Sequence, residues 1–136
     1  MSYLLDTNVL SERLRPRPDR GVRDWFASVA AEDLYISALV IGEVTNGVEA
    51  LRRRDAPRAT RYQEWLDGMV REYGPRILPV TAEIAAEWGK MGVPDPVPVV
   101  DGLMAATAKV HAMTFVTRNT AEVARTGARL LNPFSS

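Results

Sequence analysis

Acidic side chains recur in this sequence where apolar runs give way to predicted helices. Asp6 follows the strand-like run Tyr3-Leu4-Leu5 and precedes apolar residues at helical spacing. Asp101 follows Val99-Val100 at the start of another predicted helix. Ligands of open α/β sheets bind at the carboxyl ends of the strands, so both carboxylates are candidate site residues. A helix cap is the alternative explanation for each, because Asp caps helices well.

Glu43 belongs to a predicted helix that runs from Ala38 to about Arg53. On a helical wheel of about 100° per residue, Glu43 falls at about 40°, inside an apolar arc of about 0° to 200°. The pattern therefore predicts a carboxylate on the buried side of the helix. Buried charges are normally paired or bound to a metal ion, which leaves two alternatives open: a metal ligand, or a salt bridge to an arginine.

A fourth candidate lies directly after the predicted strand at residues 114–117. Asn119 is followed three residues later by Glu122, which also fits a capping box. Asp6, Asp101 and this segment are all predicted to lie at one edge of a parallel sheet. Converging carboxylates raise each other's pKa unless a cation neutralises them. Oxygen ligands without cysteine favour Mg²⁺ or Mn²⁺, and such a site carries out metal-assisted phosphodiester hydrolysis.

The predicted elements explain how these residues would meet. Strands are predicted at residues 3–5, 34–36, 77–80, 114–117 and 129–131, and helical patterns lie between them. Pro79 restricts the third strand to an edge or a strand end. The alternation predicts a three-layer α/β/α sandwich with a mostly parallel central sheet, built as a single domain over residues 1–136.

Composition excludes several classes of protein. The chain is 46% hydrophobic and 25% charged, as in ordinary globular proteins. No stretch is apolar for long enough to span a membrane and no secretion signal is recognised, so we expect a cytoplasmic protein. The absence of cysteine excludes thiolate chemistry. The net charge is zero, yet arginines cluster at residues 13–23 and 52–61, where they could contact nucleic acid or simply face solvent.

Four blocks of the sequence, in order, resemble PIN-domain ribonucleases, and among these the VapC-like and FitB-like toxins of prokaryotic toxin-antitoxin pairs. The blocks are Leu4-Leu5-Asp6-Thr7-Asn8-Val9-Leu10-Ser11, then Ile36-Ser37-Ala38 through Gly42-Glu43-Val44 and Gly47, then Val100-Asp101-Gly102-Leu103-Met104-Ala105-Ala106-Thr107-Ala108, and Thr117-Arg118-Asn119-Thr120. The resemblance covers nearly the whole chain.

The resemblance implies metal-binding catalytic roles for Asp6, Glu43 and Asp101. It also implies a fourth acid near Thr117, for which Asn119 and Glu122 are equal candidates. The candidate supporting residues are Thr7, Asn8 and Thr117, which would orient a carboxylate or a water, and Arg118, which would hold a phosphate or form a salt bridge within the site. His111 is expected to end a helix rather than act as a general base.

The resemblance further implies a homodimer and a cognate antitoxin whose C-terminal segment lies in a groove and blocks the site. Tyr62, Trp65 and Met69 are candidate groove residues, although their helical spacing also fits plain core.

The main hypothesis is thus an Mg²⁺- or Mn²⁺-dependent endoribonuclease that acts as a toxin on RNA, with DNA contacted only through the antitoxin and no membrane contact. The alternative is a weakly active module that dimerises a DNA-binding antitoxin and modulates promoter binding. A phosphohydrolase with Asp6 as nucleophile is a third possibility, but the sequence lacks the second acid two residues on.

Overall fold

Strands and helices alternate along the chain in the computed structural model, which describes residues 1–135. The strands are β1 (Tyr3–Leu5), β2 (Leu34–Ser37), β3 (Ile77–Leu78), β4 (Thr114–Val116) and β5 (Arg129–Leu131). The α-helices are α1 (Thr7–Glu12), α2 (Arg20–Ser28), α3 (Ala38–Arg52), α4 (Ala56–Tyr73), α5 (Ala82–Met91), α6 (Val99–Val110) and α7 (Thr120–Val123). This order confirms the alternation predicted from the sequence.

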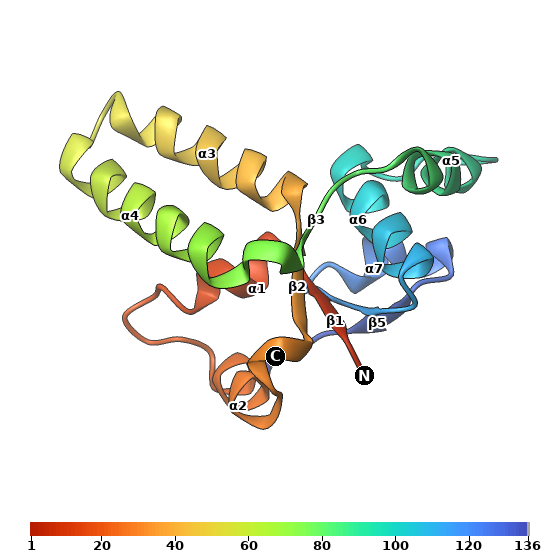
Figure 1. The fold of residues 1–136 in the computed structure, drawn as a ribbon, viewed down its shortest axis with the longest axis horizontal. Helices are drawn as coiled ribbons and strands as arrows, with labels where there is room; N and C mark the ends of the chain where they lie inside the picture. Colours follow the sequence, from red (N-terminus) through yellow and green to blue (C-terminus); the bar gives the residue numbers. More distant parts are fainter. Residues whose placement is uncertain (136) are drawn as a thin grey trace.

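The strands form one parallel sheet in the order β3-β2-β1-β4-β5. The central strand β1 has Tyr3 opposite Leu34 on one side and opposite Thr114 on the other. β3 lies at an edge, as Pro79 predicted. Helices α1 to α4 lie on one side of the sheet and α5 to α7 on the other (Figure 1). The predicted three-layer α/β/α sandwich is therefore confirmed.

The core lies on both faces of the central strands. Strands covered by helices on both faces are apolar throughout rather than alternating. Side chains without exposed surface include Leu4, Leu5, Ile36, Met104, Phe115 and Val116. Burying one such side chain contributes about 1.5–3 kcal/mol. Asp6 therefore directly follows a strand whose last two residues are fully buried.

Polar side chains fix the starts of several helices. Ser37 accepts a hydrogen bond from the Leu39 N–H (3.0 Å) at α3, and Thr81 accepts one from the Ile84 N–H (3.2 Å) at α5. Helix α6 begins differently, because its N-cap residue is Pro98, which makes no side-chain cap bond. Capping is thus the wrong explanation for Asp101, which lies in the first turn of α6.

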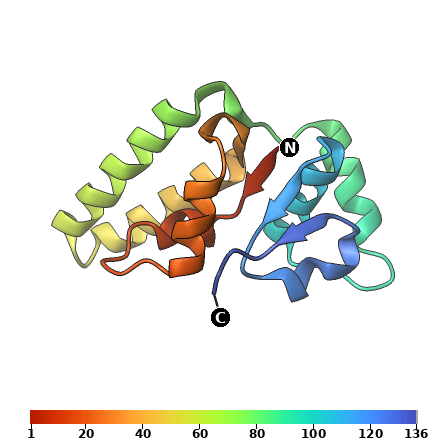
Figure 2. The same cartoon turned by 90° about the horizontal axis from the view of Figure 1, so that it is seen from below.

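Two segments extend away from the sheet. Helices α3 and α4 form a hairpin that projects beyond it (Figure 1). The C-terminal segment runs back toward α2 (Figure 2), where the Ser135 hydroxyl donates a 2.6 Å hydrogen bond to Asp19. Across residues 1–135, no helix combines the length and the apolar character that a membrane crossing requires.

Candidate active site

Asp6 is held at the carboxyl end of β1 by three neighbours. Its Oδ1 accepts a 2.8 Å hydrogen bond from the Thr7 N–H, so Asp6 does cap α1. Its Oδ2 accepts a 2.7 Å bond from the Thr117 hydroxyl and a longer one of 3.4 Å from the Asn8 amide. Only 4% of the Asp6 surface is exposed. The cap and the site residue are therefore the same side chain, and its second oxygen is oriented by Thr117, which directly follows β4.

Glu43 lies on α3, and its side chain is exposed. The predicted burial is therefore wrong, because α3 packs only along a stripe that includes Val40, Val44 and Val48 and leaves its flank open. Glu43 still reaches the site, since its Oε1 accepts a 2.7 Å hydrogen bond from the Thr7 hydroxyl. Within residues 1–135 it forms no salt bridge, so the alternative of an arginine partner is also wrong.

Asp101 on α6 and Glu122 on α7 meet through a hydrogen bond between their carboxyl groups. The pKa of Asp101 is raised to about 6, first by burial and then by the charge of Asp6, by this hydrogen bond and by the charges of Glu122 and Glu43. Burial also raises the pKa of Asp6, against the lowering effect of the Thr117 and Thr7 hydrogen bonds. The four carboxyl groups therefore interact electrostatically at the edge of the sheet.

The two candidates for the fourth position differ in their contacts. The Glu122 carboxyl contacts Asp101, and its charge also raises the pKa of Asp6. Asn119 is the N-cap residue of α7 without a side-chain cap bond, and its backbone N–H donates to the Thr117 hydroxyl (3.0 Å). The structure therefore brings Glu122, rather than the Asn119 side chain, to the other acids. His111 is the C-cap of α6, at the opposite end of the helix from Asp101.

The donor set suits a hard divalent cation. Its ligand atoms are all carboxylate oxygens, which Mg²⁺ and Mn²⁺ prefer, and a cation would relieve the repulsion that raises the pKa of Asp101. As the side chains stand in residues 1–135, no three acidic or histidine groups are close enough to hold one ion. Glu43 and Glu122 are exposed, whereas Asp6 is buried. Asp6, Asp101, Glu43 and Glu122 are the residues that would hold such an ion.

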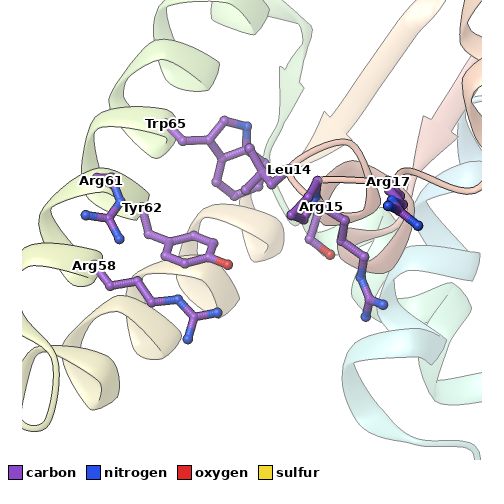
Figure 3. Close-up of a pocket in the computed structure, with 9 residues that line it drawn as sticks. Leu14, Arg15, Arg17, Arg58, Arg61, Tyr62 and Trp65 are labelled. Atoms are coloured by element: carbon purple, nitrogen blue, oxygen red, sulfur yellow. The ribbon is translucent and has the colours of Figure 1, made fainter.

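A groove of about 1010 Å³ opens between the end of α1, the loop after it and α4 (Figure 3). Tyr62 and Trp65 of α4 face Leu14 across it. A smaller cavity of about 250 Å³ continues it along α3, past Val44 and Val48. Tyr62 and Trp65 are thus groove residues, while Met69 is 4% exposed and belongs to the core.

Arginines surround this groove. The lining residues include Arg15, Arg17, Arg54, Arg58 and Arg61, and no acidic residue of the described chain lines either cavity. Arg15 pairs with Glu12 at 3.4 Å, and Arg58 lies over the Tyr62 ring at 5.6 Å. The two arginine clusters seen in the sequence therefore meet across one groove, which sequence reasoning missed because they lie on separate elements.

The sheet order, the acids at its carboxyl edge and the flanking helices define a PIN-like protein. The PIN domain family model matches residues 3–128, and the chain belongs to this family. It is similar to the toxin FitB of Neisseria gonorrhoeae, with 33% identity over 136 residues that cover 96% of this chain and 97% of FitB. It is also 31% identical to the VapC ribonuclease Y4jK of Sinorhizobium fredii, over 96% of both chains.

The fold comparison agrees. A chain in the crystal structure of FitAcB from Neisseria gonorrhoeae matches with a TM-score of 0.88 and 34% identity, over 96% of this chain and 97% of that chain. The family resemblance read from the sequence is therefore confirmed.

Proposed function

We propose that this protein is a metal-dependent endoribonuclease that acts as the toxin of a toxin-antitoxin pair. The observation that carries the proposal is that the charges of Asp6, Glu43 and Glu122 all act on Asp101 at the carboxyl edge of the sheet, where the Thr7 hydroxyl holds Glu43. Similarity to a FitB toxin and to a VapC ribonuclease supports the reaction class. The substrate would be RNA, whose phosphodiester bonds this kind of site hydrolyses.

Asp6, Asp101 and Glu43 would hold the cation, with Glu122 in preference to Asn119 as the fourth acid. A bound Mg²⁺ or Mn²⁺ ion supplies water activation and stabilisation of negative charge on the phosphate. The Thr117 hydroxyl fixes one oxygen of Asp6, and the Thr7 hydroxyl fixes one oxygen of Glu43. These hydroxyls leave each carboxylate a second oxygen or lone pair for ligation, as supporting residues of metal sites commonly do.

The test is RNA cleavage by the purified, antitoxin-free protein with Mg²⁺, with Mn²⁺ and with EDTA. We expect cleavage of at least one member of a panel of tRNA, rRNA and mRNA, and its loss in Asp6→Asn and Glu43→Gln. Glu49→Gln is the matched control, because Glu49 is exposed on the same helix α3 and pairs only with Arg52. Intact RNA with either metal, or normal cleavage by both site variants, would refute the proposal.

The same experiment separates the alternative function. A weakly active module would strengthen operator binding by its antitoxin without inhibiting growth. Isothermal calorimetry with Mn²⁺ provides a further discrimination, since a module with a residual pocket needs no ion. Growth inhibition that depends on Asp6 would exclude this alternative.

We further propose that the groove holds a segment of the antitoxin that carries apolar and acidic side chains. The aliphatic residues Leu14, Val44 and Val48 suit apolar side chains, and the arginine rim suits carboxylates. RNA fits less well, because base stacking needs a free ring face and Arg58 already lies over Tyr62. Val44 adjoins Glu43, so a bound segment would lie next to the acids and hinder substrate entry.

Calorimetry with the cognate antitoxin tests the groove. Arg58→Glu combined with Arg61→Glu should weaken binding by about 100-fold, since reversing two rim charges replaces attraction with repulsion. Arg71→Glu is the matched control, on the same helix α4 but outside the groove. Unchanged antitoxin binding with weakened RNA binding would instead assign the groove to RNA.

A further inference from the structure

Arg118 is fixed beside the acids by its backbone. It follows Thr117, whose hydroxyl holds Asp6, and its own N–H donates a 3.4 Å hydrogen bond to the Asn8 side-chain oxygen. The Asn8 amide group in turn donates to Asp6. The main chain at Arg118 is therefore connected to Asp6 through both β4 and α1, and it cannot drift away from the site without breaking these bonds.

The Arg118 side chain is held by the C-terminal segment rather than by an acid. Its guanidinium carbon lies 4.5 Å from the centre of the Phe134 ring, a cation–π contact. In residues 1–135 it forms no salt bridge, so the alternative of a salt bridge within the site is wrong. A guanidinium whose backbone borders the acidic site and that pairs with no acid of residues 1–135 needs another restraint, and the Phe134 ring supplies it.

Phe134 is itself positioned. Its N–H donates a 3.0 Å hydrogen bond to the Asn132 side chain, Pro133 is buried, and Ser135 is bonded to Asp19 at the start of α2. The ring is therefore a fixed platform from a distant part of the chain. Stacking occupies the face of the guanidinium and leaves its N–H edge available, and this edge matches a phosphate with two hydrogen bonds.

We propose that Arg118, held on Phe134, binds a phosphate of the RNA strand next to the bond that is cut. The inference rests on the proposed function. An acidic site repels the RNA backbone, and an unpaired cation fixed at its edge offsets that repulsion and sets the position of the strand. Arg118 is thus a substrate-binding residue, and Phe134 is a positioning residue that acts through it.

The first test measures binding without cleavage. A fluorescent single-stranded RNA that the wild-type protein cuts, or a mixed-sequence RNA if it cuts none, is titrated with full-length protein in EDTA at several salt concentrations. Arg118→Gln should weaken binding by about tenfold and reduce the salt slope by about 0.7, the value for one phosphate contact on a single strand. Phe134→Leu should weaken binding by about threefold, because the cation remains but is no longer held.

The second test measures steady-state cleavage with Mg²⁺ or Mn²⁺. Arg118→Gln should raise KM by about tenfold with kcat within about twofold, and Arg118→Lys should restore part of the loss because it keeps the charge but not the planar fork. Arg13→Gln and Phe26→Leu are the matched controls. The Arg13 guanidinium stacks on the Phe26 ring, 4.2 Å from its centre, and this pair lies away from the carboxylate cluster.

Two results would overturn the inference: unchanged binding and KM in Arg118→Gln, or an equal loss in Arg13→Gln, which would indicate a general charge effect. If the wild-type protein cuts no RNA with either ion, the proposed function fails, while the EDTA titration still decides the role of Arg118. Thermal unfolding of each variant excludes loss of fold, and Arg118→Lys provides the same comparison if Arg118→Gln does not fold.

Discussion

Replacing Asp101 with Asn should stabilise the metal-free protein while it abolishes cleavage. The pKa of Asp101 is raised from 3.8 to about 6, chiefly by burial and by the charge of Asp6. Because the pKa of Asp101 is higher in the folded than in the unfolded state, Asp101 contributes to the free energy of unfolding in full below about pH 3.8. This contribution is lost as the pH rises through about 6. At neutral pH the ionised side chain therefore weakens the fold, and a neutral Asn side chain does not.

The magnitude follows from the size of the shift. A shift of about two units corresponds to about 3 kcal/mol for a fully buried group. Asp101 is only half-buried, so solvent screening leaves about 1 kcal/mol. For a chain of 136 residues, this difference corresponds to about 3–4 °C in the unfolding midpoint. The Asn amide can also donate to Glu122, as the protonated acid does.

The assay is thermal unfolding of both proteins in EDTA, near neutral pH and at a pH of about 4. The variant should be more stable near neutral pH, and the gap should close at the lower pH. Comparing the two proteins cancels the opposite contributions of Asp19 and Glu87, whose pKa values are lowered by their bonds to Ser135 and Lys109. Added Mn²⁺ should stabilise the wild type more than the variant. A variant that is less stable at both pH values would refute the reasoning.

Four further predictions concern support of the site and packing elsewhere in the fold. Thr117→Val should cost about 2 kcal/mol in urea unfolding at neutral pH, because the buried Asp6 carboxylate loses a 2.7 Å donor; Thr117→Ser, which keeps the hydroxyl, should cost less. Gly102→Ala should cost about 1–3 kcal/mol, since a Cβ there would lie 2.7 Å from Val97 and 3.0 Å from Trp88. Gly89→Ala, with nothing within 4 Å, should instead stabilise α5 by about 0.5–1 kcal/mol. Gly21→Ala should loosen the C-terminal segment, because the added carbon would collide with the Pro133 carbonyl, and faster proteolysis of that segment would reveal it; an unchanged digestion pattern would contradict this.

Local chemistry allowed much of the fold to be predicted. The alternation of strands and helices and the restriction at Pro79 depend on a few neighbouring residues at a time, and the structure agrees with both. The exposure of Glu43 could not be predicted. A helical wheel gives the direction of a side chain, but it does not show how far the packing against the neighbouring elements extends.

Contacts between residues that are far apart in the chain could not be predicted from the sequence. The stacking of Arg118 on Phe134 depends on the path of the last residues past α2. The choice between Asn119 and Glu122 depends on how α7 sits against α6, since only that packing brings Glu122 to Asp101. The expected homodimer stays a prediction, which light scattering of the purified protein would test.

Helix α3 carries Glu43 at the site and Val44 and Val48 in the cavity beside it. Adjacent positions on a helix differ by about 100° in direction, so a residue inserted or deleted in α3 before Glu43 would rotate Glu43 and the cavity wall together. The position of Glu43 at the site and the shape of the cavity therefore depend on the same helix and change together. Changes that alter partner choice without altering the acids are expected instead on α4, where Arg58, Arg61 and Tyr62 line the groove and where, in residues 1–135, neither arginine forms a salt bridge. Orthogonal toxin-antitoxin pairs would be most readily engineered by varying that helix alone.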